Sequence, residues 1–189
     1  MLRSSAKLCL WNPPMQKCAS SILDLAESAR RQIAFTWDYQ EMGVKAPRWQ
    51  RVKTLAEMAA SAVPLDCVWL KVETGPLEVF ADPLMEKVFF NLIENSVRHV
   101  EKTANIRISF RDHDDFGVML FEDDGVGVAA PLKEQIFEQA FGRNTGYGLF
   151  LAREILGITG ISIRETGLEG EGTRFEIKIP KKHYRMDGC

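Results

Sequence analysis

Asn91-Leu-Ile-Glu-Asn-Ser-Val-Arg-His99 lies inside a segment, from about Pro83 to Val100, whose side chains divide into two faces at helical spacing. One face is polar and contains Lys87, Asn91, Glu94, Asn95, Arg98 and His99. The other is a broad apolar stripe of Met85, Phe89, Phe90, Leu92, Ile93, Val97 and Val100. Asp82 is a good N-cap, and Pro83 suits the first helical position. The spacing therefore predicts an amphipathic helix that packs against a core.

Two asparagines, Asn91 and Asn95, stand in the middle of this polar face. Asparagine is a weak helix former, but each costs only about 0.5 kcal/mol relative to alanine. That cost is too small to prove a function, because an ordinary solvated helix face tolerates it equally well. Whether the face is a site depends on the motifs that follow it.

Composition and charge are those of one globular domain with a short appendage. The chain has 189 residues, of which 46% are hydrophobic and 26% charged, and a net charge of −2. Neither sign of charge dominates a long block, which argues against a nucleic-acid or anionic-membrane partner. No apolar run reaches the roughly 20 residues of a membrane helix. The apolar part of the first ten residues is also too short for a signal peptide.

The cysteines carry no metal or disulfide signature. Cys9, Cys18, Cys67 and Cys189 are scattered, with no C-x-x-C pair and no spacing typical of zinc ligands. We interpret them as reduced thiols, which favours a cytoplasmic location. If the parent protein is bound to a membrane, its anchor is expected outside this chain.

Upstream of the central segment, the sequence predicts two helices. Residues 1–14 end in Asn-Pro-Pro and are expected to be loose. From Met15 to about Met42 apolar residues recur at threes and fours without proline or glycine, until Gly43 and Pro47 end the helix. A second helix is expected from about Arg48 to Ala62.

After Pro64 the pattern changes to short strands. Strands are predicted near 67–72, 77–80, 106–110, 116–121, 161–163 and 175–179, with helices near 132–140 and 147–156. The strands at 106–110 and 116–121 flank a polar turn and are expected to form a hairpin. Because strands and helices are interleaved without regular alternation, we expect an α/β (α+β) two-layer sandwich with a mixed β-sheet. This domain is expected over 63–181, with a tail at 182–189.

Asp123-Asp-Gly-Val-Gly127 directly follows a predicted strand. A carboxylate there can accept a hydrogen bond from an exocyclic amino group such as that of adenine. It would reject guanine, whose oxygen offers no donor at that place. The two glycines would allow close backbone approach. The alternative is a plain turn, since Asp-Gly is a common turn dipeptide, and by itself this motif favours the turn.

Two further glycine-rich stretches follow. Gly142-Arg-Asn-Thr-Gly-Tyr-Gly-Leu149 runs into a predicted helix, and free N–H groups at a helix start bind phosphates. It could equally be a plain loop, and no Gly-Lys-Ser or Gly-Lys-Thr occurs, which excludes a P-loop. Gly170-Glu-Gly-Thr173 precedes the last strand and reads mainly as a hairpin turn.

Order and spacing together are more specific than any one stretch. An Asn-x-x-x-Asn helix, Asp-x-Gly-x-Gly, a segment with Phe137 and Phe141, Gly-x-Gly-Leu and Gly-x-Gly-Thr follow one another over about 80 residues. This series resembles the catalytic ATP-binding domain of sensor histidine kinases, within the GHKL ATPase superfamily. Residues 91–99 resemble its N box, 123–127 its G1 box, 137–141 its F box and 146–149 its G2 box. The resemblance implies a mixed sheet with helices on one face, the Bergerat ATP-binding fold, preceded here by a long N-terminal helix.

The resemblance also implies residue roles and the cofactors ATP and Mg²⁺. Asn95 would be the metal ligand with Asn91 beside it, and Arg98 would meet phosphate oxygens, so these three are the implied catalytic residues. One carboxamide is enough, because Mg²⁺ usually keeps water and substrate phosphates as its other ligands. Asp123 would take the adenine amino group, with Thr173 behind that end of the base. The implied lining of the site also includes His99, Gly125, Gly127, Phe141, Gly146, Gly148 and Leu149.

The upstream residues resemble part of the same architecture. Residues 15–62 resemble the second helix of the dimerisation and histidine-phosphotransfer hairpin with its connector. The family's acceptor histidine is not found there, because no histidine precedes His99. His113 lies in a predicted turn and His183 in the predicted tail, so neither is a credible acceptor. We therefore expect a kinase fragment, or a protein that phosphorylates a histidine on a helix supplied elsewhere, with a homodimer and a response regulator receiver domain as partners of the full-length kinase.

Asn91 helps to choose between branches of the superfamily. Hydrolytic members have a glutamate there that activates water, and an amide cannot act as that base. Phosphoryl transfer to an imidazole needs positioning and charge neutralisation more than a base, so Asn91 favours a kinase. The segment between Phe141 and Gly146 is short for an ATP lid. A serine kinase of the anti-sigma type and a non-catalytic ATP-binding switch remain alternatives.

Overall fold

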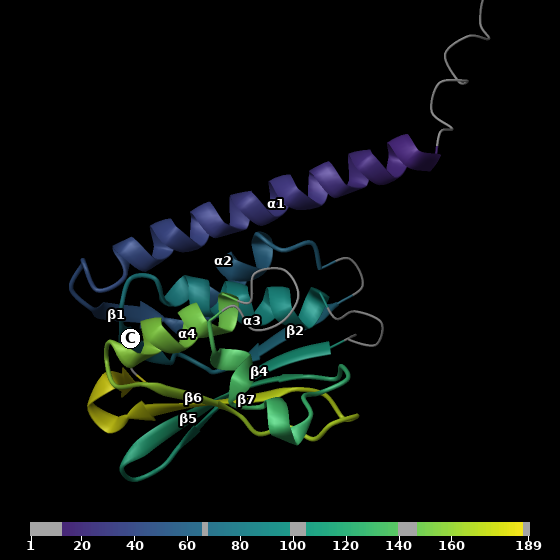
Figure 1. The fold of residues 1–189 in the computed structure, drawn as a ribbon. Helices are drawn as coiled ribbons and strands as arrows, with labels where there is room; N and C mark the ends of the chain where they lie inside the picture. The colour runs from purple at the N-terminus through teal and green to yellow at the C-terminus, as the bar shows by residue number, and fades with distance from the viewer. Residues whose placement is uncertain (1–12, 66–67, 99–104, 140–146, 187–189) are drawn as a thin grey trace, which may run out of the picture.

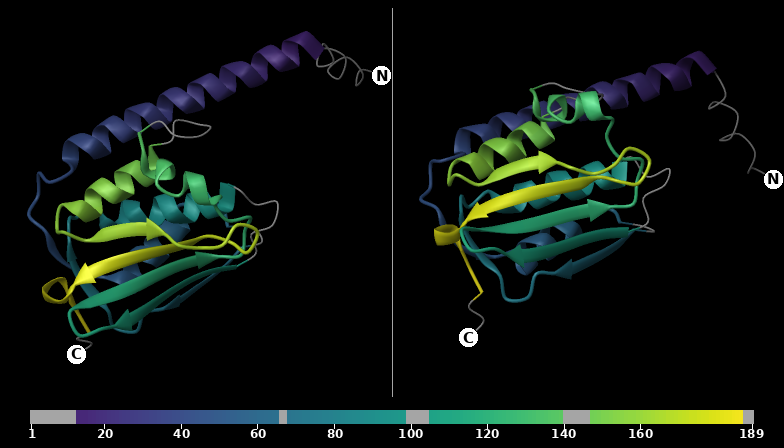
Figure 2. Two further views of the ribbon diagram at one scale, coloured as in Figure 1. Left: turned by 60° about the horizontal axis from the view of Figure 1, so that its bottom comes forward. Right: turned by 90° about the horizontal axis from the view of Figure 1, so that it is seen from below.

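A mixed five-stranded sheet forms the base of the molecule (Figures 1 and 2). The computed structural model describes residues 13–65, 68–98, 105–139 and 147–186. The sheet has the order β2-β4-β5-β7-β6, and β2 and β4 are parallel while the other neighbours are antiparallel. Its strands are β2 (Trp69–Glu73), β4 (Asn105–Asp112), β5 (Phe116–Asp123), β6 (Ser162–Glu165) and β7 (Arg174–Pro180).

Helices cover one face of this sheet (Figure 2). They are α2 (Val52–Ser61), α3 (Met85–Arg98) and α4 (Gly148–Gly157). The 29-residue helix α1 (Pro13–Glu41) lies across the outer side of this helix layer, away from the sheet (Figure 1). The predicted architecture, a two-layer sandwich with a mixed sheet and a long N-terminal helix, is confirmed.

The core between sheet and helices follows from alternation in the strands. On β4, Ile106 and Ile108 enter the core, and on β7, Phe175, Ile177 and Ile179 do so, while the residues between them are more exposed. Strand β5 lies between β4 and β7 and is buried on both faces, which explains its nearly continuous apolar run. The expected hairpin of β4 and β5 is present.

Helix α3 buries most of the predicted stripe. Its buried side chains are Met85, Val88, Phe89, Leu92, Ile93 and Ser96. Phe90 is only half-buried, because it lies toward α1 rather than toward the sheet. The carboxylate of Asp82 accepts hydrogen bonds from the Leu84 and Gly43 N–H groups. Asp82 therefore caps the start of α3, as expected, and ties it to the end of α1.

Three segments differ from the sequence-based expectation. Arg48–Arg51 is not helical but forms strand β1 of a small sheet, β1-β3-β8, with β3 (Glu78–Ala81) and β8 (Tyr184–Arg185). Antiparallel pairing of β1 with β3 outweighs its helical spacing, and the helix begins only at Val52. The expected tail contains a 3₁₀ turn, η3 (Lys181–His183), and β8, whose Tyr184 is buried.

The helix expected near 132–140 is the third difference. The chain there forms two 3₁₀ turns, η1 (Ala130–Leu132) and η2 (Gln135–Phe137). Proline at the start of the first turn removes a backbone donor, and each turn is only three residues long. Phe137 is nevertheless buried and packs edge-to-face on Phe175, with ring centroids 6.1 Å apart.

Candidate functional site

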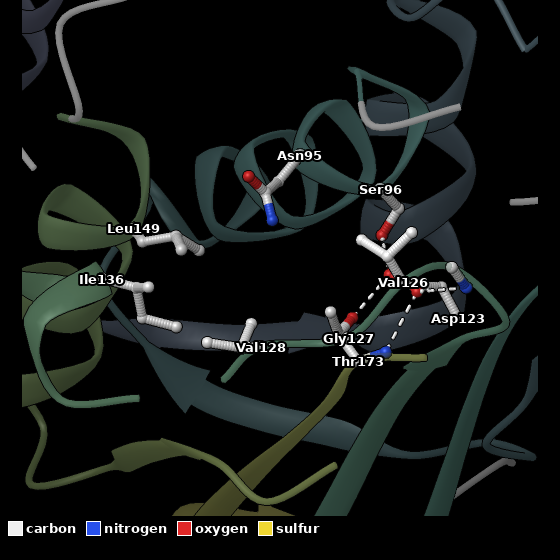
Figure 3. Close-up of a pocket in the computed structure, with 10 residues that line it drawn as sticks. Asn95, Ser96, Asp123, Val126, Gly127, Val128, Ile136, Leu149 and Thr173 are labelled. Carbon is white, nitrogen blue, oxygen red and sulfur yellow. Dashed lines mark hydrogen bonds between the residues drawn. The ribbon is translucent and has the colours of Figure 1, made fainter. Parts of the chain in front are cut away.

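A cavity of about 200 Å³ lies between α3 and the ends of β5 and β7, and we call it the Asp123 pocket (Figure 3). Helix α3 contributes Asn95 and Ser96, and the start of α4 contributes Leu149. The end of β5, the segment after it and the residue before β7 contribute Asp123, Gly125, Val126, Gly127, Val128 and Thr173. In Figure 3, Leu149, Ile136 and Val128 stand at one end, and Ser96, Asp123 and Thr173 at the other.

Asp123 is the last residue of the buried strand β5, and protein donors bind both oxygens of its carboxylate. One carboxylate oxygen, Oδ1, accepts from the backbone N–H groups of Gly125 (2.9 Å) and Thr173 (3.1 Å). The other, Oδ2, accepts from the hydroxyls of Ser96 (2.6 Å) and Thr173 (2.5 Å). The residue is 8% exposed, so a charged group here depends on these donors. Four hydrogen bonds fill the lone pairs of a carboxylate.

Ser96 was missed by the sequence analysis. Helical spacing places it one turn after Leu92, in the buried stripe, where a hydroxyl needs a partner. Its place in the buried stripe is the sequence signal that could have identified Ser96. Its hydroxyl is 2.6 Å from Asp123 Oδ2 and 3.2 Å from the Leu92 carbonyl, so it has two acceptors within reach.

The walls of the pocket are apolar. Val126, Val128, Ile136 and Leu149 line it, and only Leu149 was expected among them. The spaced valines in the glycine-rich segment after β5 alternate with glycines, which is the sequence signal for this wall. A flat aromatic ligand would contact these walls and present its polar edge to Asp123.

Two glycines allow the loop before β7 to lie against the end of β5. Gly172 has a φ of +111°, and a Cβ there would overlap the Asp123 carbonyl oxygen. Gly127 has a φ of +72°, and a Cβ there would lie 2.6 Å from the Leu168 carbonyl oxygen. The Gly170-Glu-Gly-Thr173 stretch is therefore more than a hairpin turn, because it brings Thr173 to the Asp123 carboxylate.

Glu165, the last residue of β6, also binds the loop before β7. Its carboxylate accepts from the N–H groups of Gly167 (2.9 Å) and Arg174 (3.2 Å) and pairs with Lys133 (2.7 Å). The Glu165 side chain is fully buried. Glu165 thus supplies a buried acceptor that holds the loop before β7 in place.

A second hollow, of about 180 Å³, lies between α1, α3 and the start of α4, and we call it the α1 groove. It is lined by Arg30, Arg31, Phe35 and Asp38 of α1, by Lys87, Asn91, Glu94 and Arg98 of α3, and by Tyr147 and Gly148. Asn91, which lines the groove, and Asn95, which lines the Asp123 pocket, are one helical turn apart on α3. Gly148 lines the groove and the next residue, Leu149, lines the Asp123 pocket.

The groove is rich in charge. Arg98 pairs with Glu94 at 2.7 Å, and Lys87 pairs with Asp38 at 3.4 Å. The Asn91 side-chain nitrogen is buried and has no hydrogen-bond partner among the described residues. A Cβ on Gly148 would lie 3.3 Å from the Asn91 side-chain oxygen, so the glycine allows α4 to begin close to Asn91.

The expected site residues thus fall into three groups. Asn95, Asp123, Gly125, Gly127, Leu149 and Thr173 meet in the Asp123 pocket. Asn91, Arg98 and Gly148 line the α1 groove. His99, Phe141 and Gly146 lie outside the described residues. Within the described part of the chain, no cluster of three or more His, Cys, Asp or Glu side chains could hold a metal ion, and no helix is long and apolar enough to cross a membrane.

Comparison with known proteins gives consistent matches. Residues 81–183 match the model of the family described as histidine kinase-, DNA gyrase B-, and HSP90-like ATPase. The CAI-1 autoinducer sensor kinase/phosphatase CqsS of Vibrio cholerae is 30% identical over 111 residues, 56% of this chain and 16% of its own length. Sensor protein SrrB of Staphylococcus aureus is 30% identical over 106 residues, 51% of this chain and 18% of its own.

A solved structure agrees with the fold. Full-length ShkA in complex with AMPPNP has a TM-score of 0.67 and 18% identity, and the match covers 86% of this chain and 38% of that one. This likeness shows the fold alone. The chain spans less than a fifth of the length of the two curated relatives it matches.

Proposed function

Because the chain belongs to the family of histidine kinase-, DNA gyrase B- and HSP90-like ATPases, we propose that the Asp123 pocket binds the adenine of ATP in the catalytic domain of a sensor histidine kinase. The observation that carries this proposal is the buried Asp123 carboxylate on the pocket floor. The two curated relatives, a sensor kinase/phosphatase and a sensor protein, support the same reading.

Adenine recognition requires one change in the hydrogen bonds of Asp123. All four of its lone-pair positions are occupied by protein donors, so the adenine amino group must replace one of them. Ser96 is the donor that can leave at least cost, because its hydroxyl can turn to the Leu92 carbonyl. Thr173 and Gly125 would keep the carboxylate in place during this exchange.

The phosphates would lie between the pocket and the α1 groove. Asn95 would hold Mg²⁺ together with phosphate and water oxygens, and a bound Mg²⁺ would supply charge neutralisation to the triphosphate. The absence of an acidic cluster among the described residues fits a metal that arrives with the nucleotide. The buried Asn91 amide, Arg98 and the first N–H groups of α4 would orient the phosphate oxygens.

Asn91 supports phosphoryl transfer over hydrolysis. It cannot remove a proton from water, and the nearby Glu94 carboxylate is held by Arg98. The γ-phosphoryl group would pass to a histidine imidazole on another segment, because α1 contains no histidine. His113 stacks on Phe116 in the turn between β4 and β5, far along the chain from any long helix. A response regulator would then receive the phosphoryl group, and α1 would take part in a homodimer of the whole kinase.

The experiment is a transfer assay with the full chain, Mg-ATP and a separately made helical hairpin that carries an acceptor histidine. Acid-labile phosphohistidine on the hairpin is the expected product. Asn95→Ala should abolish the Mg²⁺ dependence of ATP binding while adenosine binding is retained. Acid-stable phosphoserine would instead favour a serine kinase, and tight ATP binding without any transfer would indicate a binding module.

A further inference from the structure

We propose that Arg31 of α1 binds the terminal phosphate of the nucleotide, so that the long N-terminal helix completes the phosphate subsite. This inference rests on the proposed ATP site, and it adds a residue 60 positions before Asn91. It makes triphosphate affinity depend on how α1 lies against the catalytic domain.

The position of Arg31 is set by the docked face of α1. Arg31 lies one helical turn before Phe35, and residues four apart share a face. Phe35 stacks on Tyr147, with ring centroids 4.2 Å apart and planes at 16°. Three residues after Phe35, Asp38 pairs with Lys87 of α3. These contacts hold the face that carries Arg31 over the α1 groove.

Of the two α1 arginines that line the groove, Arg31 has the more unused donors. Arg30 uses two nitrogens, Nε and Nη2, on the Glu27 carboxylate. Arg31 gives the same carboxylate only its Nε, at 3.0 Å. Toward described residues, neither terminal nitrogen of Arg31 makes a hydrogen bond, and its side chain is only 27% exposed. On α3, Lys87 pairs with Asp38, and Arg98 gives one nitrogen to Glu94. Guanidinium nitrogens in this arrangement suit a phosphate oxygen.

Other features of the groove suit an anion. The Asn91 side-chain nitrogen is buried without a partner among described residues, and Gly148 begins helix α4 beside it. A helix start attracts negative charge through its free N–H groups. A nucleotide with its base at Asp123 passes Asn95 and then Asn91, about 6 Å along α3, before it reaches Arg31.

The test is a titration of the full chain with ATP, ADP and adenosine. Arg31→Gln should weaken ATP binding about tenfold, since one charge-assisted contact is lost. ADP should be affected less, and adenosine not at all. Lys45→Gln is the matched control: it removes one positive charge close to the end of α1, but Lys45 is 70% exposed and pairs with Glu41 outside the groove. It should change ATP affinity by less than about twofold.

A second variant tests the same contact, but it is expected to raise ATP affinity instead of lowering it. Glu27 holds both arginines, whose hydrogen bonds lower the pKa of its carboxyl to about 2, so it is ionised at neutral pH and competes with phosphate. Glu27→Gln should therefore tighten ATP binding about two- to threefold, and this gain should vanish when Arg31→Gln is also present. Unchanged ATP affinity in Arg31→Gln, with normal adenosine binding, would overturn the inference alone. Failure of the unsubstituted chain to bind adenosine would overturn the proposed ATP site as well.

Discussion

The Asp123 pocket and the α1 groove hold their polar groups in opposite ways. In the pocket, Asp123, Ser96 and Thr173 are attached to strands and a buried helix face, and they bond to one another away from water. In the groove, the charged groups come from α1 and α3, are half exposed and meet as ion pairs. Buried networks are rigid and costly to disturb, whereas exposed ion pairs contribute little and exchange partners easily.

If the proposed function holds, this difference gives the two hollows separate tasks. The pocket would select one base, because protein donors fix the Asp123 carboxylate and burial keeps most water from it. The groove would vary its affinity for phosphate, because the ion pairs of its cations are partly exposed and can exchange a carboxylate for a phosphate oxygen. A movement of α1 would therefore alter phosphate binding and leave base recognition unchanged.

The largest effect is expected at Gly172. Gly172→Ala places a Cβ in the Asp123 backbone at a φ of +111°, so strain and overlap should lower the free energy of unfolding by at least about 3 kcal/mol. Adenosine binding should also be lost. Urea denaturation measures the first effect and calorimetric titration the second. Gly170→Ala is the control, with a φ of +89° and open space around the Cβ, and it should cost only about 1 kcal/mol. Equal costs for the two variants would contradict the close approach.

Asp123→Asn comes next. Its amide nitrogen would face either the backbone N–H groups of Gly125 and Thr173 or the adenine amino group, which can only donate, so ATP affinity should fall about a hundredfold. Asp124→Asn, at the exposed neighbour, should change the affinity little. Wild-type affinity in Asp123→Asn would show that the carboxylate only ends a strand.

Phe35→Ala tests the groove without touching a charge. Loss of the ring that stacks on Tyr147 should loosen α1 and weaken ATP binding about fivefold, while adenosine binding stays the same. The control is Trp37→Ala on the same helix, because Trp37 is 64% exposed. A parallel loss of adenosine affinity in Phe35→Ala would mean that the two hollows do not act separately.

The smallest effect is expected from Ser96→Ala. One buried hydrogen bond is lost, which should lower the free energy of unfolding by about 1 kcal/mol. Adenosine affinity should stay constant or rise slightly, because a lone pair of Asp123 no longer needs to be vacated. A clear loss of adenosine affinity would indicate that Ser96 itself holds the base.

Local pattern predicted those parts of the molecule that depend on neighbouring residues. The stripe of α3, the hairpin of β4 and β5 and the strand that ends in Asp123 all follow from spacing along the chain. The β1 strand did not, because its four residues are extended only through pairing with β3, about 30 residues later. Pairing of this kind overrides local helical spacing.

The site residues also divide into those that local sequence pattern predicted and those that it did not. Asp123 and the glycines stand in recognisable motifs, so their convergence could be expected. The Ser96–Asp123 bond joins residues 27 positions apart, and the contact of Phe35 with Tyr147 joins α1 to the residue just before α4. Helical periodicity indicates which face of a helix is buried, but not which side chain of another element meets it. The α1 groove could therefore be found only in the folded chain.

The most direct test of the account compares ATP with inosine triphosphate, which carries a carbonyl oxygen where ATP carries the amino group. Calorimetric titration of the unsubstituted chain with each nucleotide gives the ratio of affinities. If Asp123 accepts from the amino group, ATP should bind at least about a hundredfold more tightly, because the carbonyl oxygen would face the buried carboxylate. In Asp123→Asn the preference for ATP over inosine triphosphate should be lost. Equal affinity of the unsubstituted chain for both nucleotides would contradict base recognition by Asp123.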